Sequence, residues 1–367
     1  MKEQTKLLEV KYKGSLVGKL ALTATDKVAF QYDSDWIKNG FSISPFSLPL
    51  DNKVFVPVNY NYDGLFGVFA DSLPDSWGRL LLDRMLLSKG IDVQQLTVLD
   101  RLSIVGTSGM GALEYYPEYK IETNKSQLSL DELAEECNKI FQSISNTEYT
   151  GADIDSLFAQ GGSSGGARPK AFIKYNNEDW IVKFPYSKDI YNTGKLEYEY
   201  SIKATACGID MSETKLFPSK TCSGYFGTKR FDRPKIHMIS AAALLEVDFE
   251  RSLADYADLF KLISILTAAN KHDIEQMYLR MCFNVIMKNQ DDHLKNFAFL
   301  YDDQNSIWRL SPAYDLTRAE SGYGQHTTTI NGKGINISNN DLIAIGQKAG
   351  ITKKKCTELL DKVVSNA

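Results

Sequence analysis

One short polar run combines the residue types that phosphoryl transfer requires. Asp291 precedes Asn296 by five residues, and Asp315 follows both. A carboxylate can accept the proton of an attacking hydroxyl, while an amide oxygen and a second carboxylate can hold Mg²⁺ against nucleotide phosphates. The pattern predicts Asp291 as the catalytic base, Asn296 and Asp315 as metal ligands, and ATP with Mg²⁺ as cofactors. Taken alone, the same spacing also fits loop residues that cap a helix end.

The elements on either side of this run should position its side chains. Apolar residues recur with helical spacing over 274–286, which predicts a buried helix that ends at the run. Residues 297–301 and 306–310 have the pattern of a hairpin. Because the two ends of a hairpin are neighbours, we expect Asn296 to lie beside Asp315.

A glycine-rich run over 161–170 is the second candidate for phosphate binding. Glycines let backbone N–H groups approach phosphate oxygens, and a predicted hairpin over 171–185 returns Lys183 toward them. Gly166 is followed by Ala167 rather than by Lys and Ser or Thr, so the Walker A pattern is absent. The arrangement is kinase-like, with a flexible linker as the alternative on composition alone.

The N-terminal part has the pattern of a β-rich domain. Alternating residues over 7–22 and 28–32 predict a small antiparallel sheet. Ser72 and Asp75 have capping-box spacing ahead of a helix over 77–88.

Another glycine run, 106–111, precedes a strand rather than a helix, so we interpret it as a loop and not as a phosphate site. Polar residues over 119–127 predict a domain boundary. Downstream, Glu197 on a helix over 195–207 is a candidate partner for Lys183, an ordinary solvated glutamate being the alternative.

Composition restricts the class of protein. With 43% hydrophobic and 24% charged residues, a chain of 367 residues can bury a substantial core. The net charge of −4 argues against a nucleic-acid coat or a polybasic membrane contact. The five cysteines form no Cys-x-x-Cys pair, which favours reduced thiols. Because no signal core and no run of about 18 apolar residues occurs, we expect a cytoplasmic protein without a membrane contact.

Several of these motifs resemble one family. Residues 289–297 followed by 311–316 look like the C-terminal core of the HipA-type serine/threonine kinase toxins of type II toxin–antitoxin systems. Residues 69–79 resemble the N-terminal subdomain of that family, although a well-capped scaffold helix explains them without any catalytic role. Residues 226–234 resemble its adenine-lining strand and hinge. The resemblance extends from about residue 7 to residue 350.

The resemblance implies an α+β fold, in which a β-rich N-terminal domain is followed by a protein-kinase-like domain with a mainly helical C-terminal lobe. We expect the N-terminal subdomain over 1–120, connecting helices over 121–160 and the catalytic domain over 161–367. The expected nucleotide-binding residues are Ser164, Gly165, Gly166, Ala167, Arg168, Lys170, Lys183, the backbone of Lys229, Arg230 and Phe231, and then His293, Lys295, Asn296, Tyr314 and Asp315. His293 is not expected to bind metal, since no second histidine or cysteine has suitable spacing.

The resemblance also implies regulation and partners. Ser163, or alternatively Ser164, would be autophosphorylated, and the added charge would repel the nucleotide phosphates. A helix-turn-helix antitoxin similar to HipB would hold the toxin on operator DNA, and the substrate would be an aminoacyl-tRNA synthetase, particularly the glutamyl enzyme. The alternatives are a small-molecule kinase and a non-catalytic ATP-binding corepressor that acts with its antitoxin.

Overall fold

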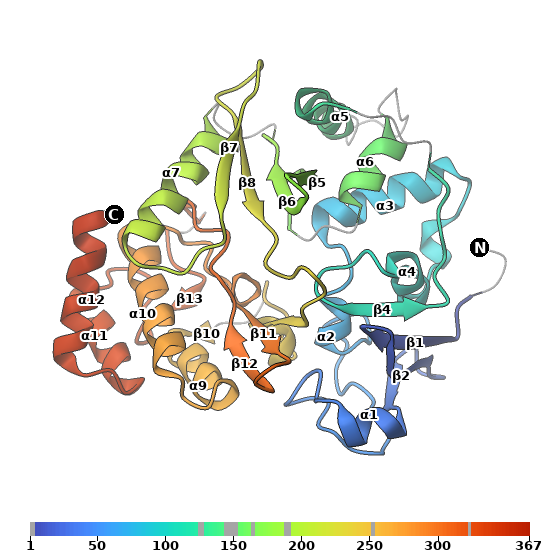
Figure 1. The fold of residues 1–367 in the computed structure, drawn as a ribbon, viewed down its shortest axis with the longest axis horizontal. Coiled ribbons are helices and arrows are strands. Elements are labelled where there is room, and N and C mark those ends of the chain that lie inside the picture. The colour runs from blue at the N-terminus through green and yellow to red at the C-terminus, as the bar shows by residue number, and fades with distance from the viewer. Residues whose placement is uncertain are drawn as a thin grey trace. The chain divides into compact units, whose positions relative to one another are not determined.

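The computed structural model describes residues 4–123, 128–142, 153–162, 166–186, 192–250, 254–321 and 324–367. The chain divides into two compact units, and Figure 1 labels most of their helices and strands. The first unit consists of Met1–Gly194, Leu216–His237 and Ala243–Glu246, and the second consists of Lys195–Lys215, Met238–Ala242 and Val247–Ala367.

The first unit begins with the expected antiparallel sheet. Its strand order is β3-β2-β1-β4, with bounds β1 (Leu7–Tyr12), β2 (Ser15–Leu22), β3 (Val28–Tyr32) and β4 (Leu113–Tyr116). Alternate residues of β1, namely Leu8, Val10 and Tyr12, are buried, as a sheet with one covered face requires. The prediction from the alternation is confirmed.

The helices of the first unit are α1 (Ser34–Asn39), α2 (Gly67–Ala70), α3 (Ser76–Ser88), α4 (Val98–Val105), α5 (Leu130–Gln142) and α6 (Ile154–Gly161). The capping box predicted for Ser72 and Asp75 is wrong. Asp75 is itself the N-cap of α3 and makes no side-chain cap bond, because its carboxylate accepts the backbone N–H of Gly166. The hydroxyl of Ser72 is instead hydrogen-bonded to the Tyr115 hydroxyl at 2.7 Å.

A second sheet in the order β5-β6-β8-β7 carries the predicted glycine-adjacent hairpin. Its strands are β5 (Lys170–Tyr175), β6 (Glu178–Lys183), β7 (Thr214–Phe217) and β8 (Tyr225–Lys229). The turn residues Asn176 and Asn177 both have positive φ, +52° and +62°, which is the geometry of a tight hairpin turn.

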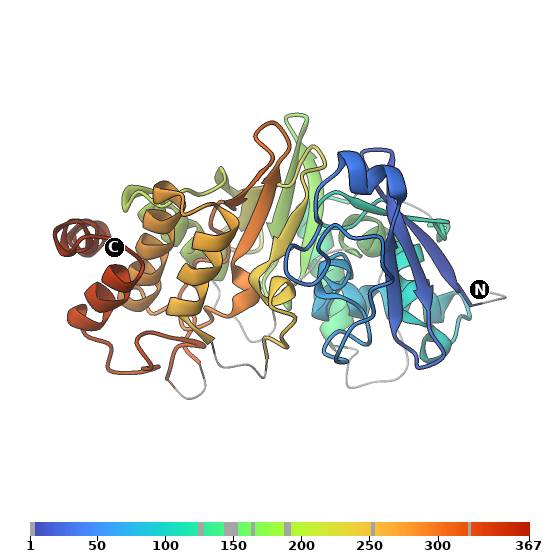
Figure 2. The same cartoon turned by 90° about the horizontal axis from the view of Figure 1, so that it is seen from below.

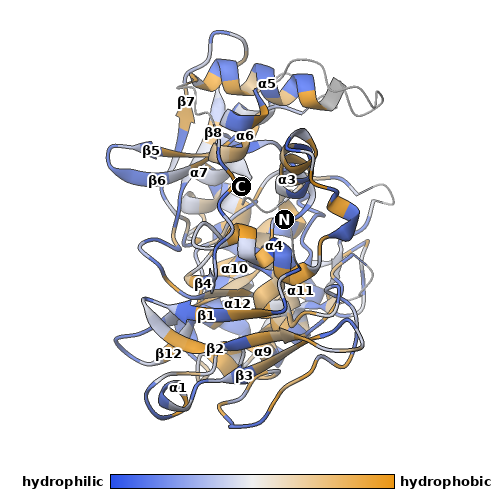
Figure 3. Cartoon of the chain, turned by 90° about the vertical axis from the view of Figure 1, so that its right-hand side faces the viewer, coloured by the Kyte–Doolittle hydropathy of each residue, from blue (hydrophilic) through white to orange (hydrophobic). Residues whose placement is uncertain are grey.

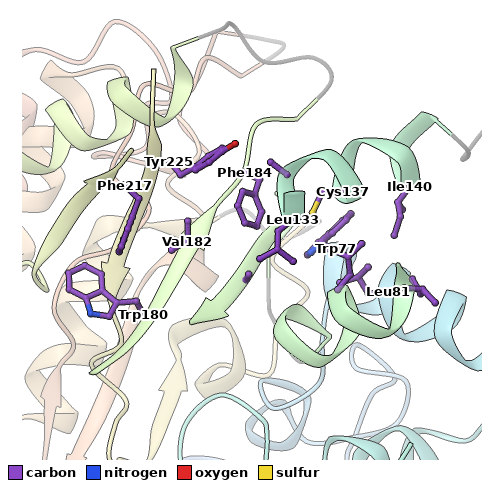
Figure 4. Packing of buried hydrophobic residues seen from close by; sticks show 14 of the residues in the cluster. Trp77, Leu81, Leu133, Cys137, Ile140, Trp180, Val182, Phe184, Phe217 and Tyr225 are labelled. Atoms are coloured by element: carbon purple, nitrogen blue, oxygen red, sulfur yellow. The ribbon is translucent and has the colours of Figure 1, made fainter. Parts of the chain in front are cut away.

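One hydrophobic core joins this sheet to the helices that precede it. Trp77 of α3 packs in the same cluster as Cys137 of α5, Val182 of β6 and Phe184, which follows β6 (Figure 4). Polar and apolar residues alternate around α5, which turns its apolar side to this cluster (Figure 3). The first unit therefore combines the β-rich N-terminal region and the glycine-adjacent hairpin around shared packing.

The second unit is mainly helical. Its helices are α7 (Thr193–Ala206), α9 (Tyr256–Leu266), α10 (Lys271–Ile286), α11 (Asn339–Lys348) and α12 (Lys353–Asn366). The residues of the short helix α8 (Ala241–Leu244) are divided between the two units. Helix α10 is buried along most of its length, and α11 and α12, red in Figure 2, pack beside it. The helix predicted over 274–286 is thus confirmed.

Short strands complete the second unit. The sheet β12-β11-β9 consists of β9 (Met238–Ser240), β11 (Ala298–Asp302) and β12 (Ile307–Leu310), and β10 (Ala254–Asp255) pairs in parallel with β13 (Thr328–Thr329). Phe299 pairs with Leu310, which confirms the hairpin predicted around residues 302–305.

The five cysteines are all free thiols, and four of them are buried, as expected of reduced cysteines. Within the described part of the chain, no helix is both long and apolar enough to cross a membrane.

Candidate functional site

The polar run that follows α10 forms a loop tied to residues far away in the sequence. Asn289 is buried, and its amide donates to the side-chain oxygen of Asn284 at 3.0 Å and to the backbone carbonyl of Asp315 at 3.4 Å. The backbone N–H of Gln290 donates to the carbonyl of Ala319 at 2.8 Å. The start of the loop is therefore fixed against the segment that carries Asp315.

Asp292 anchors the centre of the loop, a role that the sequence did not indicate. Its side chain is fully buried and accepts hydrogen bonds at 2.9–3.2 Å from the Tyr256 hydroxyl, His326 Nδ1 and the backbone N–H groups of Thr327 and Thr328. Burial raises the pKa of Tyr256 well above its ordinary value, which keeps that hydroxyl protonated as a donor. A carboxylate with this many donors holds the loop rigidly.

Asp291 faces the opposite way from its neighbour. Its side chain is 65% exposed, and one carboxylate oxygen lies 3.7 Å from His293 Nε2. A carboxylate on a rigid loop that remains open to solvent can approach a substrate hydroxyl. The adjacent pair Asp291 and Asp292 thus divides into a presented acid and a buried anchor.

The side chain of Asn296 is oriented by the loop itself. Its amide nitrogen donates to the backbone carbonyl of Asp291 at 2.7 Å, so the amide oxygen is the atom left to act as a ligand. The Tyr314 hydroxyl donates to the carbonyl of Lys295 at 2.7 Å. The Tyr314 hydroxyl thus links the residue before Asp315 to the residue before Asn296. The predicted approach of the Asn296 and Asp315 side chains stays a prediction.

The donor set fits a magnesium ion better than a softer metal. Asn296 and Asp315 offer oxygen atoms, the ligands that Mg²⁺ prefers, and phosphates and water usually complete its coordination. Among the described residues, no group of three or more His, Cys, Asp or Glu side chains could hold a metal without such help. Asp315 has a φ of +53°, a strained value for a residue other than glycine and one that is found at functional sites.

His293 and Lys295 pack against an aromatic ring that the sequence did not single out. The Phe249 and His293 rings are 4.8 Å apart, and Lys295 Nζ lies 5.4 Å from the Phe249 ring centre. Nδ1 of His293 is buried without a hydrogen-bond partner among the described residues. The contribution of both side chains to phosphate binding stays a prediction.

Lys170, Lys183 and the glycine-rich run, which are also expected to bind the nucleotide, belong to the first unit. Lys170 and Lys183 are paired across β5 and β6, so Lys183 does return to the start of the hairpin as predicted. Lys170 is 91% buried, and its ammonium lies so close to Gly166 that a Cβ there would be 2.5 Å from Nζ. Ala167 is exposed and Arg168 half-buried. Ser163, Ser164 and Gly165 lie outside the described residues.

Both backbone groups of Gly166 are hydrogen-bonded to the N-terminal end of helix α3. The Asp75 carboxylate accepts the N–H of Gly166, and the backbone N–H of Trp77 donates to the Gly166 carbonyl at 3.2 Å. Gly166 has a φ of +84°, a conformation that favours glycine. The motif around residues 69–79 therefore has a structural role next to the glycine-rich run.

This contact predicts a measurable effect of Asp75→Ala. Loss of one charge-assisted hydrogen bond should weaken ATP binding about three- to tenfold, because the glycine-rich run would no longer be held in one position. Isothermal titration with ATP measures the dissociation constant. Thr97→Ala is the matched control, since the Thr97 side chain caps α4 in the same unit by bonding to Asp100. Equal affinities for Asp75→Ala and wild type would contradict the prediction.

Lys229 and Arg230, at the end of β8, are bonded to the hairpin of β5 and β6. The backbone N–H of Arg230 donates to the carbonyl of Asp179 at 2.8 Å, so it is already engaged, and the Lys229 ammonium pairs with Glu178. If Lys229, Arg230 and Phe231 contact the base as predicted, they would do so through backbone groups other than the N–H of Arg230.

The burial of Glu197 distinguishes between the two interpretations drawn from the sequence. Glu197 is only 3% exposed, so the interpretation as a solvated glutamate is wrong. A buried carboxylate must be paired or hydrogen-bonded to remain stable. Its pairing with Lys183 stays a prediction.

Comparison with known proteins identifies the family. A family model described as the HipA-like C-terminal domain matches residues 162–367, and one described as the HipA N-terminal domain matches residues 8–116. Among solved structures, the HipA, HipB and operator DNA toxin–antitoxin complex of Shewanella oneidensis MR-1 contains a chain with a TM-score of 0.70 to this one, at 21% identity. The match covers 98% of this chain and 88% of that chain.

Two curated proteins of Sinorhizobium fredii (strain NBRC 101917 / NGR234) are also similar. "Putative kinase Y4dM" is 27% identical over 196 residues, which are 48% of this chain and 47% of that protein. "Putative kinase Y4mE" is 28% identical over 151 residues, 37% of this chain and 33% of that protein. The chain thus matches about half the length of these relatives or less.

The expected fold class is confirmed by the fold likeness and by both family models. The model of the C-terminal domain alone covers more than half of the 367 residues. This chain therefore belongs to the HipA family, with a HipA N-terminal domain followed by a HipA-like, kinase-like C-terminal domain.

Proposed function

We propose that this chain is an ATP-dependent serine/threonine protein kinase that acts as the cytoplasmic toxin of a toxin–antitoxin pair. The loop after α10 is the observation that carries the proposal. Buried Asp292 fixes this loop, exposed Asp291 is presented to solvent, and the Asn296 amide is turned so that its oxygen can ligate a cation. Residues 161–367 would form the catalytic domain and 1–120 the N-terminal subdomain, joined by 121–160.

In the proposed reaction, a substrate hydroxyl attacks the γ-phosphorus of ATP while Asp291 accepts the hydroxyl proton. The bond between the γ-phosphorus and the bridging oxygen breaks, and ADP leaves with that oxygen. Lys170 and Lys183 neutralise phosphate charge. Asn296 and Asp315 would hold Mg²⁺, which offsets the negative charge of the phosphates when it is bound.

We infer the partners from family membership. The solved relative of similar fold is in complex with HipB and operator DNA, which supports a HipB-like helix-turn-helix antitoxin as the partner. The net charge of −4 supports contact with operator DNA through that antitoxin rather than directly. The substrate proposed for the toxin is an aminoacyl-tRNA synthetase, with the glutamyl enzyme first.

Transfer from radiolabelled ATP tests the proposal. Wild-type chain is incubated with purified aminoacyl-tRNA synthetases and, separately, with a metabolite panel. We expect a labelled synthetase, loss of all labelling with EDTA, and recovery with added Mg²⁺ because the phosphate charges need the cation. Label in metabolites alone would indicate a small-molecule kinase. Absence of any transfer, with operator repression by the antitoxin complex intact, would indicate a corepressor.

Autophosphorylation is a separate prediction. After incubation with ATP, the peptide that contains residues 161–170 should carry phosphate on Ser163, and the modified chain should lose ATP affinity through charge repulsion. Mass spectrometry locates the phosphate. Ser163→Ala should prevent it, whereas Ser164→Ala is the matched control. A fully covered peptide without phosphate would rule the modification out.

A further inference from the structure

The loop predicted over residues 106–111 is present, and it binds the segment that follows β8. Arg233 donates through Nη1 to the Gly111 carbonyl at 3.0 Å and through Nη2 to the Gly109 carbonyl at 3.2 Å. Lys235 Nζ donates to the Thr107 carbonyl at 2.7 Å. All of these residues belong to the first unit. Three backbone carbonyls of one loop thus accept from side chains more than 120 residues away.

Asp232 is the centre of this contact. It is only 1% exposed and accepts the backbone N–H of Gly111 at 2.8 Å, two bonds from Arg230 at 2.9 and 2.6 Å, and one from Arg233 at 2.7 Å. Burial acts to raise the pKa of Asp232, but the hydrogen bonds and charges of the two arginines outweigh it and hold this pKa below its ordinary value. The carboxylate therefore stays charged and keeps all four donors.

The same segment is also attached to the hairpin of β5 and β6. The Arg230 guanidinium lies 4.5 Å from the centre of the Phe172 ring, and its backbone N–H donates to Asp179. Residues 229–235 are thus held between the hairpin on one side and the loop 106–111 on the other. A segment that is bonded to neighbouring elements on both sides is held in place before any ligand arrives.

We propose that Arg233 and the loop 106–111 position the backbone of residues 229–231 for the nucleotide base. The inference rests on the proposed function and on the expectation, implied by the family resemblance, that this backbone contacts the base. Arg233 acts as a positioning residue here, because its guanidinium bonds to the loop and to Asp232. The β-rich N-terminal domain would then contribute to the nucleotide site through this loop and through the hold of α3 on Gly166.

Substitution of Arg233 should therefore weaken the binding of ligands that contain a base and leave the binding of phosphates alone unchanged. Arg233→Gln removes the charge and the forked geometry that reaches two carbonyls and Asp232 together. We expect adenosine and ATP to bind about tenfold more weakly to this variant, while inorganic triphosphate, which lacks a base, binds as it does to wild type. Arg233→Lys keeps the charge but not the fork, so its affinity for adenosine should be intermediate.

Arg101→Gln provides the matched control. Arg101 lies in the same unit, is 11% exposed against 18% for Arg233, and pairs with Asp83 at the same 2.7 Å. It contacts Asp83 rather than the segment after β8. A fluorescent ATP analogue displaced by adenosine, ATP or triphosphate measures all affinities on the intact chain. Equal weakening of adenosine and triphosphate binding, or weakening of neither, would overturn the proposal.

Amide hydrogen exchange of the nucleotide-free chain separates this inference from the proposed function. Residues 229–235 should exchange about tenfold faster in Arg233→Gln than in wild type or Arg101→Gln, since their protection comes from the contact with the loop. A wild-type chain that binds no ATP would reject the proposed function. Faster exchange in Arg233→Gln than in wild type would still support the role of Arg233 in holding residues 229–235. Unchanged exchange in Arg233→Gln would overturn it.

Discussion

Asp291→Asn should lower kcat for phosphoryl transfer by about 10²–10⁴-fold, the usual contribution of a general base. Asn has nearly the same size as Asp but cannot accept the hydroxyl proton. Because the Asp291 side chain is 65% exposed, the free energy of unfolding should change by less than about 0.5 kcal/mol. ATP affinity should also stay close to that of wild type, since the residue is not among those assigned to the nucleotide.

Single-turnover transfer from labelled ATP measures the rate, and chemical denaturation measures the stability. Asp361→Asn is a suitable control, because Asp361 is an exposed aspartate on α12 of the same unit. A variant Asp291→Asn that transfers phosphate at the wild-type rate would show that another group accepts the proton, and the proposed mechanism would then be wrong.

The neighbouring substitution Asp292→Ala should act mainly on stability. It leaves the Tyr256 hydroxyl, His326 and two backbone N–H groups without their buried acceptor, all within a site of almost no exposure. Leaving several buried donors without their acceptor should destabilise the protein by about 3–5 kcal/mol, since each unsatisfied buried donor costs about 1–3 kcal/mol. We expect a loss of that size, accompanied by loss of transfer because Asp291 and Asn296 would no longer be held in place.

Asp291→Ala is the matched control for Asp292→Ala, because each variant removes one carboxylate and the two positions are adjacent. Denaturation should show a large loss of stability for Asp292→Ala alone. Faster hydrogen exchange over residues 289–296 should accompany it, because the loop loses its anchor. Equal stabilities of the two variants would contradict the division into a presented acid and a buried anchor.

Local patterns in the sequence were sufficient to predict the elements that carry the site. Helical spacing predicted α10, and turn residues between alternating segments predicted the hairpins that bring Lys183 to Lys170 and the neighbours of Asn296 and Asp315 together. These predictions succeeded because helix periodicity, strand alternation and hairpin turns depend on residues close together in the chain.

The division of roles between Asp291 and Asp292 could not be read from the sequence. Two adjacent aspartates have the same chemistry, and only the packing of His326 and Thr327, 34 and 35 residues away, decides which of them is buried. The expected capping box of Asp75 failed for the same reason, because its carboxylate accepts the N–H of Gly166, 91 residues away.

The sequence by itself therefore determined the family, the order of the elements and the residue types available for phosphoryl transfer. The tertiary structure alone decided which carboxylates serve as anchors, as in Asp292 and Asp232, and which is left open to solvent, as in Asp291. The physical reason is that burial and hydrogen-bond partners arise from contacts between segments distant in sequence, such as Gly111 and Asp232, 121 residues apart. Local periodicity leaves such contacts unspecified.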